Sequence, residues 1–187
     1  DYEERYYAAG KIKGSRFIKR EGRPSDDAVL SGRAVDRTVR PLFDSRMRNE
    51  VQVVVTTLSI DGENDPDVVA MIGASAALAL SDIPWNGPIG AVRIGMAADG
   101  TLVLNPVSEE RKASALDLLL SGTKDKINMI EAGANEITEE KIAEAFQFGF
   151  EAIQKIASFI EDIRKEAGKE KRQAAVLRGS LEFEADI

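Results

Sequence analysis

The residues of this chain best suited to chemistry are cations gathered within residues 10–48. Eleven lysines and arginines lie there beside five acidic residues, so the segment carries +6, whereas the whole chain carries −7. The rest of the chain therefore carries −13. An acidic chain that gathers its positive charge in one segment is expected to present that charge to an anion. The cations are Lys11, Lys13, Arg16, Lys19, Arg20, Arg23, Arg33, Arg37, Arg40, Arg46 and Arg48.

The composition narrows the chemistry further, because the chain has neither cysteine nor histidine. Disulfides, thiolate metal sites and thiol redox chemistry are therefore excluded. The usual general base and the commonest transition-metal ligand are missing as well. No apolar run reaches the ~18 residues of a membrane span, and no signal peptide is evident. Because the 187 residues begin at Asp1 rather than methionine, we expect a fragment of a longer cytoplasmic protein.

Part of the basic segment is expected to be helical. Ser25 can cap a helix, and the two aspartates that follow it suit the positive end of the helix dipole. The helix should end at about Arg40, because the next residue is proline. Three arginines spaced i, i+4 and i+7 then form a row opposite the apolar face. These are Arg33, Arg37 and Arg40.

The remaining elements indicate a mixed fold. β-branched residues predict a buried strand over residues 51–60, and small residues predict a closely packed helix over 65–80. A hairpin is expected over 89–104 and a second pair of strands over 115–132. A long amphipathic helix is expected over 138–167, with an apolar stripe of Ala143, Phe146, Phe150, Ile153, Ile156 and Ile160. This irregular alternation favours a mixed α/β sandwich over a doubly wound parallel sheet.

Several separate motifs resemble the first core domain of the bacterial polynucleotide phosphorylases, or polyribonucleotide nucleotidyltransferases. They occur in the family's order and the resemblance covers residues 1–167. The motifs are YAAGKI (7–12), FIKREGRPS (17–25), DR (36–37), RPLF (40–43), NEVQV (49–53), NDPD (64–67), AMIGASAAL (70–78) and NGPIGA (86–91). The resemblance implies an RNase PH-type α/β fold whose N-terminal strands are missing here. It assigns residues 168–187 to a linker or to the start of a helical domain.

The same resemblance implies an activity and partners. The family carries out 3′-to-5′ phosphorolysis of RNA, in which inorganic phosphate attacks the terminal linkage and releases nucleoside diphosphates. For the full-length enzyme it implies Mg²⁺, a second core domain and a homotrimeric ring with a channel for single-stranded RNA. No membrane partner is expected.

The resemblance places an RNA-binding loop at Phe17, Lys19 and Arg20, with Arg16 as an additional phosphate contact. An aromatic ring can stack on a base while the cations meet phosphates, which gives sequence-tolerant binding of single strands. Ile18 stands where the family commonly has a second aromatic residue, so stacking should be weaker. The alternative is a solvated basic loop anchored by Phe17.

Arg33 and Arg37 match family positions that lie towards the active site of the second core domain. Guanidinium groups suit bidentate binding of phosphate, so we expect both to contact reacting phosphates. The alternative is ordinary ion pairing with the acidic remainder of the chain, and for Arg40 the two interpretations are equally good.

The catalytic groups, by contrast, are not expected in this chain. The catalytic domain of the family has a serine-rich phosphate turn, where this chain has Asp65, Pro66 and Asp67. The two carboxylates would repel phosphate and the proline lacks a donor N–H. The catalytic domain also has two metal-binding aspartates and a lysine, where this chain keeps Asp117 but has Leu119 at the lysine position. A lone aspartate holds Mg²⁺ poorly, so we expect Asp117 to be structural. We expect no catalytic or metal-binding residue in this chain, and no activity of the chain alone.

Two other functions stay open. The chain could be a stand-alone RNase PH-like exoribonuclease, which the absent phosphate turn and lysine disfavour. It could also be a structural or interaction module that has lost RNA binding, which the single basic segment in an acidic chain disfavours.

Overall fold

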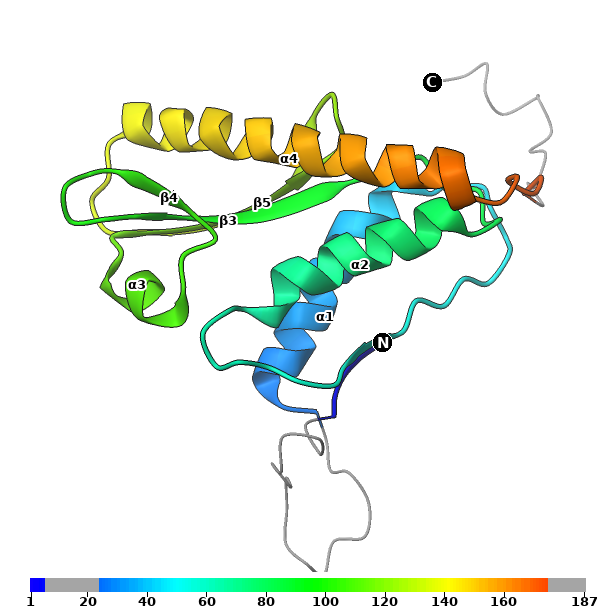
Figure 1. Cartoon of the computed structure of the whole chain (residues 1–187), viewed down its shortest axis with the longest axis horizontal. Coiled ribbons are helices and arrows are strands. Elements are labelled where there is room, and N and C mark those ends of the chain that lie inside the picture. The colour runs from blue at the N-terminus through cyan, green and yellow to red at the C-terminus, as the bar shows by residue number, and fades with distance from the viewer. Residues whose placement is uncertain (6–23, 175–187) are drawn as a thin grey trace, which may run out of the picture.

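The computed structural model of the protein describes residues 1–5 and 24–174. A four-stranded sheet lies between the long helix α4 on one face and the helices α1 and α2 towards the other, as Figure 1 shows. The predicted mixed α/β class is therefore confirmed. The elements are, in chain order, β1 (Tyr2–Glu4), α1 (Asp26–Val39), the 3-10 helix η2 (Arg40–Leu42), β2 (Val55–Thr57), α2 (Pro66–Leu80), β3 (Gly90–Met96), β4 (Leu102–Leu104), α3 (Ser108–Ala113), β5 (Leu116–Gly122), β6 (Ile127–Ala134) and α4 (Glu139–Ala167).

The main sheet is antiparallel throughout, with the strand order β4-β3-β5-β6. Both predicted strand pairs are therefore present. Side chains alternate between the two faces of a strand, and β5 follows this rule. Leu116, Leu118 and Leu120 are buried in the core under α4, whereas Leu119 belongs to the core formed with α1 and α2. The odd-numbered positions of β5 thus face the layer that carries the basic residues.

Helix α4 covers the sheet closely because small residues lie at its centre. A Cβ atom on Gly149 would lie 2.4 Å from Cδ1 of Ile94, so a larger residue there would force the ends of the neighbouring side chains to move. The predicted helix is confirmed, as is the burial of Ile153 and Ile160 in its stripe. Ala143 is an exception, since it is exposed and the buried line runs through Ala145 instead. At about 100° per residue, these two positions point away from each other.

Helix α1 begins where the sequence predicts, because the Ser25 hydroxyl accepts a hydrogen bond from the backbone N–H of Ala28 at 3.1 Å. It ends at Val39, and η2 then turns the chain through the Arg40–Leu42 segment. Helix α2 packs beside α1, and its fully buried Met71 lies in their common core. The short helix α3 was not predicted from the sequence.

The predicted buried strand over residues 51–60 is wrong in extent and in burial. Only Val55–Thr57 form a strand, which pairs in parallel with β1. Val53 and Val55 pack against the core, but the alternate residues Val54 and Leu58 are 54% and 63% exposed. The physical reason is that this small sheet has two strands in the described chain and packs only one of its faces.

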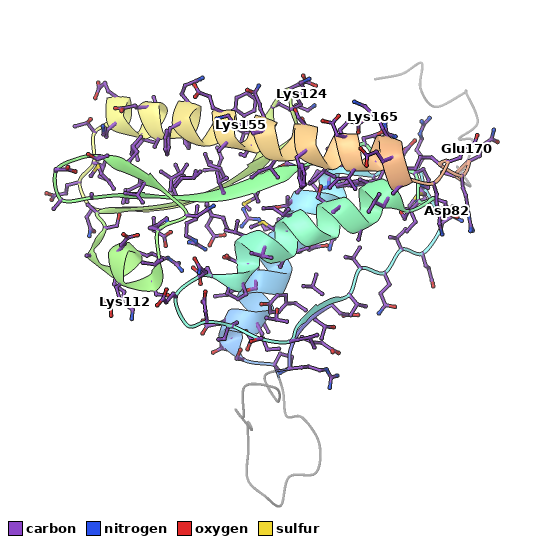
Figure 2. The ribbon with its side chains drawn as sticks, in the orientation of Figure 1. Asp82, Lys112, Lys124, Lys155, Lys165 and Glu170 are labelled. Atoms are coloured by element: carbon purple, nitrogen blue, oxygen red, sulfur yellow. The ribbon has the colours of Figure 1, made fainter. Side chains whose placement is uncertain are left out.

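Residues 169–172, which follow α4, pack against the C-terminal end of α2. The Lys171 ammonium donates to the carbonyls of Leu78 at 2.7 Å, Ala79 at 3.1 Å and Ser81 at 2.6 Å. Arg172 pairs with Asp82, which lies at the same end of the molecule as Glu170 (Figure 2). A lysine at least ninety positions further along the chain therefore donates to the carbonyls at the C-terminal end of α2 and its cap. None of the helices within residues 1–5 and 24–174 has the length and apolar character needed to cross a membrane.

Candidate functional site

The arginines of α1 and of the adjoining η2 are exposed, as predicted, but they differ in their partners. Arg40 forms an i,i+4 ion pair with Asp36, with Nη2 2.5 Å from Oδ2. Arg37 reaches across to the sheet, where its Nη1 lies 3.4 Å from Oε2 of Glu131. Arg33 forms no ion pair with any residue that the structure describes. Of the three, Arg33 is therefore the cation most available to an external phosphate.

A buried polar network fixes the helix that presents these arginines. Thr38 is fully buried, and its hydroxyl accepts a hydrogen bond from Ser121 Oγ on β5 at 3.1 Å. The side-chain amide of Asn128 on β6 donates to the Thr38 carbonyl at 2.8 Å. Trp85 Nε1 donates to the Val39 carbonyl at 3.0 Å. Buried hydrogen bonds of this kind fix the rotation of a helix, so the arginine face has a defined direction relative to the sheet.

The four residues predicted to bind RNA lie outside the described residues, so that assignment stays a prediction. They are Arg16, Phe17, Lys19 and Arg20. The residues on either side of this stretch are close together, because Ser25 Oγ lies 3.4 Å from Oε2 of Glu4. The stretch therefore leaves and rejoins the described chain at the N-terminal end of α1, the end nearer to Arg33 than to Arg40.

A second charged group lies at the N-terminal end of α2. We call it the aspartate–arginine cluster, and it consists of Asp65, Asp67, Arg93, Arg111 and Asp117. The Arg93 guanidinium lies at its centre, with Nη2 2.5 Å from Asp67 Oδ2 and Nη1 2.6 Å from Asp117 Oδ1. Arg111 of α3 approaches from outside, with Nε 2.8 Å from Asp117 Oδ2 and Nη1 bonded to Asp65.

The charges of this cluster reinforce one another. Burial raises the pKa of the Asp117 carboxyl, but hydrogen bonds from Arg111 and Arg93 outweigh it and hold that pKa below its usual range. Burial lowers the pKa of Arg93, yet the neighbouring Asp67 and Asp117 raise it overall. These shifts favour the charged forms of Asp117 and Arg93, and the formal charges of the three aspartates and two arginines sum to −1.

This arrangement fits neither phosphate nor Mg²⁺. Asp65 is the residue before the first turn of α2 and Asp67 lies within that turn, so two carboxylates occupy the helix end where an anion would bind. Both oxygens of Asp117 are bonded to arginines, and a hard cation needs several free oxygen ligands. Among the described residues no group of three or more acidic side chains is free to hold a metal ion.

Arg93 was missed by the sequence analysis. A signal for it does exist, because it is the one charged residue in the apolar run of β3, Gly90–Met96. Its position alternates with Val92 and Ile94, which face α4, so it points to the opposite face. A cation that must be buried requires acidic partners, and those partners come from distant parts of the chain.

The comparisons with known proteins assign the family. Domain 1 of the 3′ exoribonuclease family, RNase PH, matches residues 1–84, and domain 2 of the same family matches residues 87–152. The chain belongs to the 3′ exoribonuclease family. The predicted relationship is confirmed by its relatives. It is 54% identical over its whole length to a polyribonucleotide nucleotidyltransferase of Alkaliphilus oremlandii, and it spans 26% of that relative.

Further matches agree with this assignment. Over 167 residues, or 89% of the chain, it is 55% identical to a polyribonucleotide nucleotidyltransferase of Pelotomaculum thermopropionicum, of which it covers 22%. The chain therefore spans about a quarter of the length of these 3′ exoribonuclease family relatives. Its fold is similar to the crystal structure of rice (Oryza sativa) Rrp46, with a TM-score of 0.65 and 15% identity over 81% of this chain and 78% of that one. The predicted RNase PH-type fold is confirmed.

Proposed function

We propose that the chain forms the RNA-binding, non-catalytic first core domain of a phosphate-dependent 3′-to-5′ exoribonuclease, a polyribonucleotide nucleotidyltransferase. The relatives of the chain support the identity of the whole enzyme. The aspartate–arginine cluster carries the non-catalytic part of the proposal. It fills the end of α2, where a catalytic domain of this family would need open phosphate and metal positions.

In this proposal the residues of the basic segment have two different roles. Arg16, Phe17, Lys19 and Arg20 hold single-stranded RNA, and Arg33 and Arg37 reach towards the reacting phosphates of a second core domain. Arg33 supports this division because it is exposed on α1 and has no ion-pair partner in the described chain. Inorganic phosphate is then held in the second core domain, with Arg33 and Arg37 reaching towards it, and Mg²⁺ is bound by that domain and not by this chain.

The proposal extends to assembly and location. Residues 1–167 form the core domain, and residues 168–187 lead into a linker or helical domain. The complete enzyme is a cytoplasmic homotrimer. The end of α4 at Ala167 supports the boundary, and Lys171 anchors the start of the tail on α2 just after it.

A stand-alone RNase PH-like exoribonuclease is the second candidate. The presence of both family domains in the chain favours it, but the bonding of both Asp117 oxygens to arginine argues against it.

A phosphorolysis assay separates the two candidates. The purified chain is incubated with a 3′-extended single-stranded RNA, inorganic phosphate and Mg²⁺, and nucleoside diphosphate release is measured beside a full-length relative. We expect release by the relative only. Phosphate-dependent release by this chain, free of contaminating enzyme, would favour the stand-alone exoribonuclease.

A further inference from the structure

We infer that strand β6 is the surface on which the second core domain docks, by adding a strand of its own to the main sheet. β6 is the last strand in the order β4-β3-β5-β6, and no strand within residues 1–5 and 24–174 pairs with its outer side. The identity of the partner rests on the proposed function, which places a second core domain next to the arginines of α1. The open edge itself is a feature of the sheet and does not depend on that function.

The hydrogen bonds of the sheet determine which backbone groups of β6 point outwards. In an antiparallel pair, residues that bond to the neighbouring strand alternate with residues whose N–H and C=O groups point away from it. The Asn135 N–H donates to the Ala115 carbonyl at 2.9 Å, so this pair bonds across the ladder between β6 and β5. Counted back along the register from this pair, the outward groups belong to Ile130, Ala132 and Ala134.

This edge lacks the features that usually prevent a further strand from pairing. Open edges are commonly protected by lysine, by proline or by a bulge. From Ile130 to Ala134, β6 has neither lysine nor proline and its register with β5 is regular. Its one charged residue, Glu131, points to the α1 layer, where it meets Arg37. On the other face Ile130 is 46% exposed, because α4 packs over β3, β4 and β5. An incoming strand would therefore find open backbone groups and an uncovered apolar side chain.

The position of β6 beside the arginines of α1 indicates which partner supplies the strand. Nη1 of Arg37 lies 3.4 Å from Oε2 of Glu131, so a domain that receives Arg37 must lie against the outer side of β6 as well. Most of the enzyme lies outside this chain, which spans about a quarter of its relatives. A second copy of this chain fits less well. Outward positions pair only with outward positions, so two joined β6 edges would place both Glu131 side chains on one face of the sheet, where like charges on neighbouring strands repel.

The test is amide hydrogen exchange, compared between this chain alone and a full-length enzyme that carries it. The amides of Glu131 and Gly133 bond to β5 and should be protected in both. We expect the outward amides of Ile130, Ala132 and Ala134 to exchange at least about tenfold more slowly in the full-length enzyme than in the chain alone. Equal rates in the two would overturn the inference. Protection that rises with the concentration of the chain alone would also overturn it, because the partner would then be a second copy.

A proline substitution tests the strand pairing itself. Ala132→Pro removes one outward N–H and leaves the bonds to β5 in place, as prolines on sheet edges do. The chain alone should therefore stay folded, whereas the protection of Ile130 and Ala134 in the full-length enzyme should be lost. Leu104→Pro is the matched control, because the same alternation points the Leu104 N–H outwards on β4, the opposite edge of the sheet. Equal loss of protection in the two variants would overturn the inference.

The exchange measurement separates this inference from the proposed function. It is made without RNA or phosphate, so equal exchange rates can be found in an enzyme that is fully active in phosphorolysis. Conversely, an Arg33→Ala variant that keeps full activity would contradict the role of the arginine while leaving the protection of β6 unchanged. If Ala132→Pro does not fold, the exchange rates of the unsubstituted chain and enzyme decide the question.

Discussion

Arg37 of α1 and Glu131 of β6 face each other between the helix layer and the sheet, with Nη1 3.4 Å from Oε2. Both side chains are more than half exposed, so this pair contributes little to stability. In the proposed function, Arg37 would have to leave Glu131 before it could contact a phosphate. Arg33 does not have to leave any acidic partner within the described chain.

Glu131→Gln should therefore release Arg37 at little cost to stability. In a full-length enzyme that carries this domain, we expect the apparent KM for phosphate to fall by up to about fivefold, which is the scale of one exposed ion pair. Steady-state phosphorolysis at varied phosphate concentration measures this. Glu140→Gln is the control, since it removes an exposed carboxylate on α4, away from α1. Identical behaviour of the two variants would show that Arg37 does not reach phosphate.

Arg33→Ala should reduce turnover more than RNA affinity in the full-length enzyme. A charge-assisted hydrogen bond made in the transition state is worth enough to lower kcat by roughly tenfold or more. Lys19→Ala/Arg20→Ala should instead weaken RNA binding, because it removes contacts that hold the RNA equally in the ground state and in the transition state. Kinetics on a long RNA and a separate binding assay are needed for each variant. The assignment of roles is reversed if Arg33→Ala lowers only the RNA affinity while the double variant lowers only kcat.

Asp117→Asn should destabilise the chain by about 3 kcal/mol at neutral pH, since it breaks a largely buried charge cluster. The folded-state pKa of Asp117 lies below its usual 3.8. The stability that the carboxylate contributes is therefore complete above that value and is lost as the pH falls through the lower, folded-state value. Urea unfolding of both proteins should show a gap that is constant near neutral pH and narrows in acid. A gap that widens in acid would contradict this assignment.

Lys171→Met should lower the free energy of unfolding by about 1–2 kcal/mol, because three carbonyls at the end of α2 lose a charged donor. Lys169→Met is the matched control, since the Lys169 backbone N–H bonds to Leu80 and its side chain is exposed. Chemical denaturation of both variants makes the comparison. An equal free energy of unfolding for the two variants would mean that the Lys171 contacts do not contribute to stability.

The elements that could be predicted from the sequence are those with strong local signals. The Ser25 cap located the start of α1, and the apolar stripe together with Thr138 located α4. The length and burial of strand β2 were overestimated, because β-branched residues indicate only a preference for strand, whereas burial depends on what covers the sheet. The Lys171 contact with α2 could not be predicted, since it joins residues about ninety positions apart.

In the candidate site, too, only the features with a local sequence signal could be predicted. Helical spacing placed Arg33 and Arg37 on one exposed face, but it could not show that Glu131 pairs with Arg37, because that contact depends on how α1 packs on β6. Asp117 was singled out, yet its partners Arg93 and Arg111 come from β3 and α3. A charged residue within an apolar strand was the available signal for Arg93.

The central claim, that this domain holds RNA through its basic segment, is tested most directly by RNA affinity as a function of salt. Fluorescence anisotropy with a single-stranded oligoadenylate should give a log–log slope of about −2, as expected for three phosphate contacts by Arg16, Lys19 and Arg20. In Lys19→Ala/Arg20→Ala the slope should shrink by about 1.4. An affinity that does not change with salt, or an unchanged slope in that variant, would contradict the account.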